Sequence, residues 1–339
     1  MSLGNILVTG GTGYIGSHTV VDLQQKGYDV FIIDNLSNSH IGVLDAIEKI
    51  SGKQPHFSKI DLCNRELLKD FFTRNSIDAV IHFAAFKSVN ESVQFPLRYY
   101  INNVLALINL MECVTEYSVP YFIFSSSCTV YGEPDYVPVD ENHPVKSPSS
   151  PYGSTKQMCE KILADISDSS NLKIISLRYF NPAGAHPSAL IGELPLNEPT
   201  NLVPVITRTA IGKIKEMIVY GNDYDTSDGS CVRDYIHVTD VATAHVSALE
   251  RLTNNKSKPN FEIFNLGAGK GFSVLEVVQG FEKMTGKKLS YRIGKRREGD
   301  VSAIYSDCKL ANSELHWQAE ASLEKILSSA WEWEQKIKS

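Results

Sequence analysis

A glycine-rich segment near the N-terminus most strongly constrains how this chain can fold. The run Thr9-Gly10-Gly11-Thr12-Gly13-Tyr14-Ile15-Gly16 directly follows the apolar residues Ile6–Val8 and opens a helical pattern. Glycine permits a tight turn and lets backbone N–H groups approach a pyrophosphate, which the N-terminus of the following helix also attracts. The spacing G-x-G-x-x-G between a strand and a helix therefore predicts a dinucleotide-binding βαβ unit.

One acidic residue indicates which dinucleotide this unit binds. Asp34 ends the apolar run Val30–Ile33 and lies 18 residues after Gly16. A carboxylate at this position accepts hydrogen bonds from an adenosine ribose and repels a 2′-phosphate. No arginine occurs between Asn35 and His40 to bind such a phosphate. We therefore expect NAD as the cofactor rather than NADP.

Short β-rich runs, most of them apolar, alternate with longer helical patterns through the first half of the chain. The runs that predict strands are Ile6–Val8, Val30–Ile33, Phe57–Ile60, Ala79–Ile81, Phe122–Phe124 and Ile174–Leu177. Continuous apolar runs are typical of parallel strands that are buried on both faces. The alternation predicts an α/β fold of Rossmann type, with a doubly wound parallel sheet and helices on both faces.

The second half predicts a smaller, mixed α/β domain. Residues 182–202 contain four prolines and predict a loop. Helices are predicted near residues 203–213, 239–252, 273–285 and 321–336. We therefore divide the chain into a nucleotide-binding Rossmann domain over residues 1–180 and a second domain over residues 181–339, with a segment of about 235–268 returning to the first.

Charge and composition argue against several classes of protein. The 339 residues include 33 Lys plus Arg and 39 Asp plus Glu, and the resulting net charge of −6 disfavours nucleic-acid binding. No apolar run approaches the ~18 residues of a membrane span, and Met1–Asn5 shows no signal-like start. The six cysteines form no C-x-x-C and the nine histidines no H-x-x-x-H, so we expect a reduced cytoplasmic setting and no metal.

Three residues form a candidate catalytic group. Tyr152 and Lys156 are four residues apart at the start of a predicted helix, so they share one face. A nearby ammonium lowers the pKa of a phenol, and a bound nicotinamidium acts in the same direction, so Tyr152 is predicted to serve as a base. Ser127 follows a predicted strand at the sheet edge where α/β folds bind ligands, and it is placed to hydrogen-bond a substrate hydroxyl.

These motifs together resemble one protein family. The runs Thr9–Gly16, Phe124–Ser127, Tyr152-x-x-x-Lys156 and Arg178–Pro182 are similar to the extended short-chain dehydrogenase/reductases. More specific runs resemble the UDP-glucose 4-epimerase (UDP-galactose 4-epimerase) family among them. These runs are Tyr14–Thr19, Asp34–Ser39, Ala183–Ser188, Arg233–Val238 and Arg296–Asp300. The resemblance covers essentially the whole chain, in order.

The resemblance implies an isomerase of galactose metabolism that interconverts UDP-galactose and UDP-glucose with tightly bound NAD. Tyr152 would take the proton of the sugar 4-hydroxyl, Ser127 would share that hydrogen bond, and hydride would pass from C4 to NAD. The 4-keto sugar would then turn and receive the hydride on its other face. Lys156 would also contact the nicotinamide ribose. A homodimer is implied, paired through residues 98–116 and 153–168.

The resemblance also implies the residues that contact each ligand. For NAD these are Gly10, Gly13, Tyr14, Ile15, Gly16, Asp34, Asn35, Leu36, Ser37, Asn38, Ser39, Asp61, Leu62, Phe83, Ala84, Lys87, Asn102, Ser127, Tyr152, Lys156 and Phe180. For the nucleotide-sugar, held mainly by the second domain, they are Ser127, Tyr152, Asn181, Asn201, Tyr220, Arg233, Arg297 and Asp300. The forked guanidinium groups of Arg233 and Arg297 suit a diphosphate, and Asp300 suits ribose hydroxyls.

Some positions depart from the family pattern. Ala85-Phe86-Lys87 and Cys128 stand where Ala-Gly-Leu-Lys and Ala are commoner, and residues 193–200 differ from the usual loop. Ile304 occupies a position that influences whether an N-acetyl group fits beside the sugar, and its branched side chain favours simple UDP-hexoses.

Four alternative functions stay open. An epimerase could act mainly on another nucleotide-sugar, such as a UDP-N-acetylhexosamine. A 4,6-dehydratase would need an acidic pair after Ser127, where Cys128 and Thr129 stand instead. A simple alcohol dehydrogenase would exchange NAD freely, whereas the predicted contacts suggest retention. A binding module that holds NAD without turnover usually lacks the tyrosine or the lysine, both of which are present.

Overall fold

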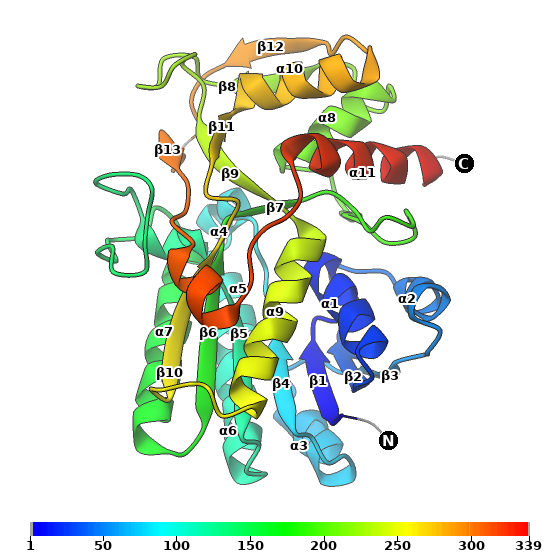
Figure 1. Cartoon of the computed structure of the whole chain (residues 1–339), viewed down its shortest axis with the longest axis vertical. Helices are drawn as coiled ribbons and strands as arrows, with labels where there is room; N and C mark the ends of the chain where they lie inside the picture. The colour runs from blue at the N-terminus through cyan, green and yellow to red at the C-terminus, as the bar shows by residue number, and fades with distance from the viewer. Residues whose placement is uncertain (1–2, 298, 338–339) are drawn as a thin grey trace.

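A parallel sheet of seven strands forms the centre of the larger part of the molecule. The computed structural model describes residues 3–297 and 299–337. The strand order is β10-β6-β5-β4-β1-β2-β3, and every pairing in the sheet is parallel (Figure 1). The strands are β1 Asn5–Thr9, β2 Asp29–Asp34, β3 His56–Lys59, β4 Ala79–His82, β5 Tyr121–Ser127, β6 Lys173–Tyr179 and β10 Phe261–Leu266. The predicted Rossmann-type α/β fold is confirmed.

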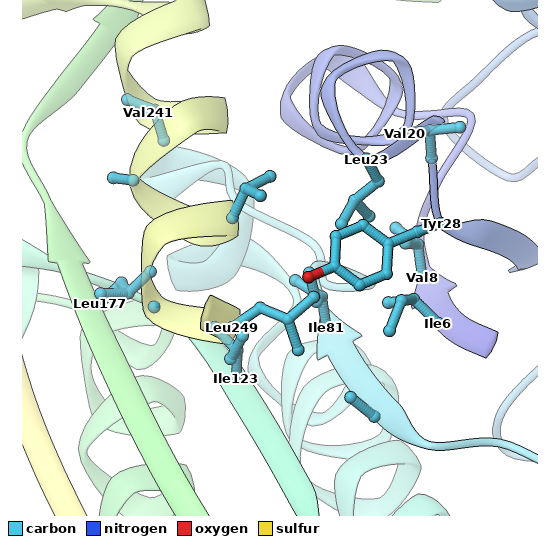
Figure 2. Close-up of a cluster of buried hydrophobic side chains, with 14 of the residues drawn as sticks. Ile6, Val8, Val20, Leu23, Tyr28, Ile81, Ile123, Leu177, Val241 and Leu249 are labelled. Carbon is cyan, nitrogen blue, oxygen red and sulfur yellow. The ribbon is translucent and has the colours of Figure 1, made fainter. Parts of the chain in front are cut away.

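Helices cover both faces of this sheet. The main ones are α1 Tyr14–Gln25, α2 Val43–Ser51, α3 Arg65–Arg74, α6 Ala106–Glu116, α7 Pro151–Ser169 and α9 Val238–Thr253. On one face, Leu23 of α1 and Leu249 of α9 pack in one apolar cluster with Ile6 of β1 (Figure 2). On the other face, Leu110 of α6 and Leu163 of α7 belong to a second cluster. The sheet therefore lies between two helical layers, with a core on each side.

The second part of the molecule is built from smaller sheets and three helices. Strands β7 Asn181–Ala183, β9 Val232–His237, β11 Gly271–Ser273 and β13 Ala303–Ile304 form one sheet, and β8 Met217–Tyr220 pairs with β12 Tyr291–Gly294. The helices are α8 Leu202–Ala210, α10 Val274–Thr285 and α11 Leu323–Lys336. They enclose a separate apolar cluster that includes Phe281 and Ile326.

The chain crosses between the two parts more than once. After β9 in the second part, α9 packs beside α1 and β10 pairs with β6 at the edge of the large sheet (Figure 1). The division of the chain at residue 180, with a returning segment, stays a prediction. What matters for the site is that β6 leads directly into β7, so the carboxyl edge of the large sheet faces the second part.

Short helical turns complete the fold. They are α4 Val89–Gln94, α5 Pro96–Tyr99, the π-helix η1 Tyr100–Leu105, the 3-10 helix η2 Cys128–Tyr131 and the π-helix η3 Ala311–Leu315. Asn103 in η1 donates to the carbonyl of Phe86 (3.0 Å) and to the hydroxyl of Thr155 on α7 (3.1 Å). Among the described residues, no helix has the length and apolar character that crossing a membrane requires.

Candidate active site

The glycine loop forms a close-packed turn at the N-terminus of α1. Gly10 has a φ of +72°, and a side chain on Gly16 would place its Cβ 2.3 Å from the carbonyl oxygen of Gly10. Helix α1 begins after Gly13, whose position caps the helix without any side-chain hydrogen bond. Backbone N–H groups at a helix N-terminus attract anions. The loop therefore presents a site that suits a pyrophosphate.

The carboxylate of Asp34 joins this loop to the loop that follows β2. Its Oδ2 accepts from the backbone N–H of Thr12 (3.2 Å), and its Oδ1 accepts from the N–H of Leu36 (2.9 Å) and the hydroxyl of Ser39 (3.2 Å). Thr12 also shares a hydrogen bond with Ser39 at 2.8 Å. These bonds fix Asp34 at the carboxyl end of β2, where it borders a large cavity.

This cavity runs along the carboxyl edge of the sheet and brings together most of the residues predicted to contact NAD. The predicted residues that line it are Gly10, Gly13, Tyr14, Ile15, Gly16, Asp34, Asn35, Ser37, Asn38, Ser39, Asp61, Leu62, Phe83, Ala84, Lys87, Asn102, Tyr152 and Lys156. Three predicted residues do not line it. Leu36 adopts a positive φ of 61°, Ser127 lies deeper at the end of β5, and Phe180 packs in an apolar cluster with Cys128 and Ile304.

Several lining residues were missed from the sequence. Thr12, Phe86 and Tyr179 border the cavity, and so do residues 190–195 and Trp333. Thr12 lies in the glycine-rich run and Phe86 in the segment Ala85-Phe86-Lys87, so both could have been predicted from the cofactor residues next to them in the sequence. Trp333 belongs to α11, at the far end of the chain, and no local pattern connects it to the glycine loop.

Tyr152 and Lys156 both reach the cavity from the first turns of α7. Their exposed fractions are only 6% and 3%. Ser150 caps α7 by accepting from the N–H of Gly153, and Pro151 occupies its first turn, which suits proline. Lys156 Nζ donates to the carbonyl of Ser125 at 2.7 Å. Its bond to Ser125 holds the first turns of α7 against the carboxyl end of β5.

The acid–base properties of this pair differ from the sequence expectation. Burial raises the pKa of Tyr152 well above its usual value, and a hydrogen bond with Ser127 opposes this effect. Burial also lowers the pKa of Lys156 to about 8. The predicted lowering of the phenol pKa is therefore wrong for the protein without cofactor, because burial disfavours both charged forms.

A buried ion pair anchors α7, the helix that carries the candidate catalytic residues Tyr152 and Lys156, to the sheet. Glu160, one turn after Lys156, accepts from Arg178 at 3.0 Å and 2.6 Å through its two oxygens. It also accepts from the hydroxyls of Ser126 (2.7 Å) and Ser176 (2.9 Å). The carboxylate thus ties α7 to both β5 and β6, one helical turn after the candidate catalytic residue Lys156.

Apart from Ser127 and Tyr152, the residues predicted to bind the nucleotide-sugar lie in the second part, and none of these lines the cavity. Arg233 on β9 forms an ion pair with Asp300 at 3.4 Å. The guanidinium of Arg297 lies over the ring of Tyr220, 4.2 Å from its centroid, and donates to the carbonyl of Thr200 at 3.5 Å. Glu298, which belongs to the run Arg296–Asp300, lies outside the described residues. The two guanidinium groups offer charged donors that suit a diphosphate, and the aromatic ring offers a stacking surface that suits a base.

The other two predicted residues lie where the parts meet. Asn181 begins β7, and its side-chain oxygen is buried without a hydrogen-bond partner. Asn201 precedes α8 and donates to Glu193 at 2.7 Å. An unsatisfied buried amide oxygen calls for an additional donor, which a hydroxyl of a bound ligand can supply.

The cavity fits NAD by its own features. The side-chain-free turn at Gly10 and Gly16 leaves room for a diphosphate, the uncapped N-terminus of α1 provides N–H donors, and Asp34 lies at the ribose position expected from the motif. Tyr152 and Lys156 lie on the wall of the same cavity, so a nicotinamide bound at their end would meet the candidate base.

Comparison with known proteins assigns the family. The family model described as GDP-mannose 4,6 dehydratase matches residues 7–330. A UDP-glucose 4-epimerase of Yersinia enterocolitica is 49% identical over 331 residues, which cover 97% of each chain. The chain belongs to the UDP-glucose 4-epimerase family. Solved UDP-glucose 4-epimerases superimpose on it over nearly their full length. One from Stenotrophomonas maltophila, with bound NAD and formylated UDP-arabinopyranose, has a TM-score of 0.95, 45% identity and 99% coverage of both chains.

A second UDP-glucose 4-epimerase structure gives the same result. The Bifidobacterium longum protein, in complex with NAD+ and UDP, has a TM-score of 0.95 and 43% identity, covering 98% of this chain and 99% of its own. The family model's description raises the dehydratase alternative, which requires an acidic pair after Ser127. Cys128 and Thr129 occupy those positions in η2, and burial raises the pKa of Cys128 to about 12. Neither residue supplies a carboxylate. Within the described residues, no group of His, Cys, Asp and Glu is arranged to hold a metal.

Proposed function

We propose that this chain interconverts UDP-galactose and UDP-glucose, as its epimerase relatives are named to do, and that it retains NAD throughout. The observation that carries the proposal is one cavity lined both by a dinucleotide-binding glycine loop and by Tyr152 and Lys156. We assign the nucleotide-sugar to a site at Arg233 and Arg297 of the second part, which do not themselves line this cavity. When bound, NAD supplies a hydride acceptor for sugar C4 and the donor for the return step.

Tyr152 is the proposed base for the sugar 4-hydroxyl. Ser127, which lowers the pKa of Tyr152 against the effect of burial, is the proposed second hydroxyl at the same reacting oxygen. Because burial raises the phenol pKa, proton removal needs a positive charge close by. Lys156 lies one helical turn away with a pKa of about 8, so it carries that charge at neutral pH. The same ammonium would contact the nicotinamide ribose.

Asn181, Asn201, Tyr220, Arg233, Arg297 and Asp300 are the proposed residues for the UDP-sugar. The two guanidinium groups neutralise the diphosphate, and the Tyr220–Arg297 stack offers a face for the uracil. A ligand held by its nucleotide leaves the hexose free to turn, which return of the hydride to the opposite face requires. Ile304 pairs with Arg233 across β13 and β9 and packs against Phe180. Its bulk supports the proposed preference for simple UDP-hexoses.

The test uses purified protein without added NAD. UDP-galactose is supplied, UDP-glucose is followed by chromatography, and the absorbance of reduced nicotinamide is recorded. Conversion without build-up of that absorbance supports the proposal. Build-up without conversion would indicate that a different sugar is the substrate. No change in either signal would favour a binding module. The same assay with the N-acetylated pair tests Ile304, since comparable rates would contradict the proposed preference.

We also propose that the protein is a homodimer in the cytoplasm. An exposed apolar surface follows α5, η1, α6 and α7, and it includes Leu97, Ile101, Leu105, Ile108 and Met158. The segments expected to pair carry this surface. Within the first segment, Leu107 and Met111 belong to the core of the subunit, whereas Ile108 is 39% exposed. The six cysteines are all free, which suits a reducing compartment. Light scattering during gel filtration measures the dimer, and Ile101→Glu should shift it to monomer.

A further inference from the structure

One segment of the cavity wall has no role in the chemistry proposed above. Residues 190–195, called the strap below, line the same cavity as the glycine loop and Tyr152. The sequence in and after the strap departs from the usual pattern of the family, so its function cannot be carried over by motif. Its contacts show how it is held in place.

The first half of the strap is fixed by backbone and packing. Ile191 is 2% exposed and belongs to the core beside α1, and its carbonyl accepts from the N–H of His186 at 3.1 Å. Gly192 forms a bridge with Ala185 and lies so close to Trp333 that a Cβ would come within 2.7 Å of its ring. The strap therefore leaves the core at Gly192, which packs closely against Trp333 of α11.

Glu193 lines the cavity and anchors this part of the strap. Its Oε1 accepts from Lys87 Nζ at 3.0 Å and from Asn201 Nδ2 at 2.7 Å. Its backbone carbonyl accepts from Trp333 Nε1 at 3.0 Å. The carboxylate side chain is 11% exposed, so this ion pair is shielded from water on the glutamate side. Three separate parts of the chain thus meet on one residue.

The other donor to this carboxylate belongs to the cofactor side of the cavity. Lys87 follows β4, and its ammonium lies 5.7 Å from the ring centroid of Tyr14 in the glycine loop. The hydroxyl of Tyr14 in turn donates to the carbonyl of Gly184 at 2.6 Å. The charge of Glu193 opposes the effect of burial and raises the pKa of Lys87. The contact between Lys87 and Glu193 therefore joins two segments of the cavity wall, the strap and the loop after β4.

We propose that Glu193 is a positioning residue that latches the strap over the bound cofactor and thereby keeps NAD on the enzyme between turnovers. The inference rests on the proposed function, because only a cofactor that is restored in each cycle gains from being retained. Opening the latch breaks a charge-assisted hydrogen bond to Lys87 and a second one to Asn201. Release of NAD past residues 190–195 then requires this opening, so the latch acts on the dissociation rate.

The experiment measures exchange of bound NAD. Protein loaded with radiolabelled NAD is isolated by gel filtration and chased with unlabelled NAD, and the remaining label is followed with time. Glu193→Ala should exchange at least about tenfold faster than wild type, equal to ~1.4 kcal/mol of barrier. Glu193→Gln keeps the size of the side chain but cannot pair with the charge of Lys87, so its rate should be intermediate. It also reports on the latch if the alanine variant does not fold.

The matched control is Glu198→Gln, which makes the same change of charge in the same loop at an exposed position. It should exchange NAD at the wild-type rate. In the variants at position 193, activity lost on dilution should return when NAD is added, which a simple folding defect would not allow. Wild-type exchange in both Glu193 variants would overturn the proposal, and so would faster exchange in the Glu198 control. A protein that retains NAD but does not convert UDP-galactose would refute the proposed function and leave the latch measurable.

Discussion

The buried pair of Glu160 and Arg178 offers a quantitative test of how the catalytic helix is held. The two side chains are 9% and 4% exposed, and the carboxylate accepts four hydrogen bonds from Arg178, Ser126 and Ser176. Glu160→Gln keeps the shape but leaves the guanidinium as an uncompensated buried charge. Removing one partner of such a pair typically costs about 3–5 kcal/mol of unfolding free energy. We expect the Gln variant to lose stability in that range.

Equilibrium unfolding in urea measures this loss. The double variant Glu160→Gln/Arg178→Met should be less destabilised than the sum of the two single variants, because it leaves no unpaired charge. The control is Asp165→Asn on the same helix, which breaks the exposed pair of Lys161 and Asp165 and should cost about 0.5 kcal/mol or less. A Glu160→Gln variant within about 1 kcal/mol of wild type would refute the argument that the uncompensated buried charge controls stability here.

Three further predictions concern the cavity. Tyr152→Phe should retain NAD yet lose about 10²–10⁴-fold in turnover, as expected for loss of a general base; near-normal turnover would remove Tyr152 from the mechanism. Gly16→Ala should weaken NAD binding at least about tenfold in a fluorescence titration, because its Cβ would lie 2.3 Å from the carbonyl oxygen of Gly10. Lys156 has a folded-state pKa of about 8 instead of 10.5. Between these values the folded protein without cofactor binds fewer protons than the unfolded chain, so its stability relative to Lys156→Met should rise by up to about 3 kcal/mol from pH 8 to 10.5. A pH-independent difference in unfolding free energy would contradict this assignment.

The fold was largely predictable because its signals are local. Each of the six runs lies within or overlaps a strand of the large sheet. Four of them are apolar throughout, as is typical of buried parallel strands, whereas Ile174–Leu177 contains Ser176, and Phe57–Ile60 contains Ser58 and Lys59 and overlaps the edge strand β3. The seventh strand, β10, was not among those runs, because Glu262 and Asn265 interrupt its apolar pattern. Its segment was expected to return to the first domain, but its pairing with β6 was not predicted. The interruption of helical geometry at η1 also escaped prediction. It depends on a change in backbone hydrogen bonding that no side-chain period records.

The candidate site likewise contains residues that local motifs predict and contacts between distant segments that they do not. Gly10, Gly16 and Asp34 were found because short-range motifs carry the turn and the ribose position. The contacts of Glu193 were not predicted, because its partners are distant in the sequence. Lys87 is 106 residues away and Trp333 is 140 residues away. No spacing rule applies over such separations. The sequence also did not predict which residues of the expected dimer segments are exposed. Leu107 and Ile108 are adjacent, yet Leu107 is buried in the core and Ile108 is 39% exposed.

Burial gives Tyr152 and Lys156 properties that follow from the cavity rather than from their spacing. Both side chains are at least nine-tenths buried, so water cannot stabilise a phenolate or an ammonium there. The raised pKa of Tyr152 means that the protein alone holds the phenol protonated at neutral pH. A cationic nicotinamide beside the ring would add the positive charge that favours the phenolate. The phenolate that acts as the base is therefore scarce until the cationic cofactor is in place. A strap that retains the cofactor would keep that condition satisfied from one turnover to the next.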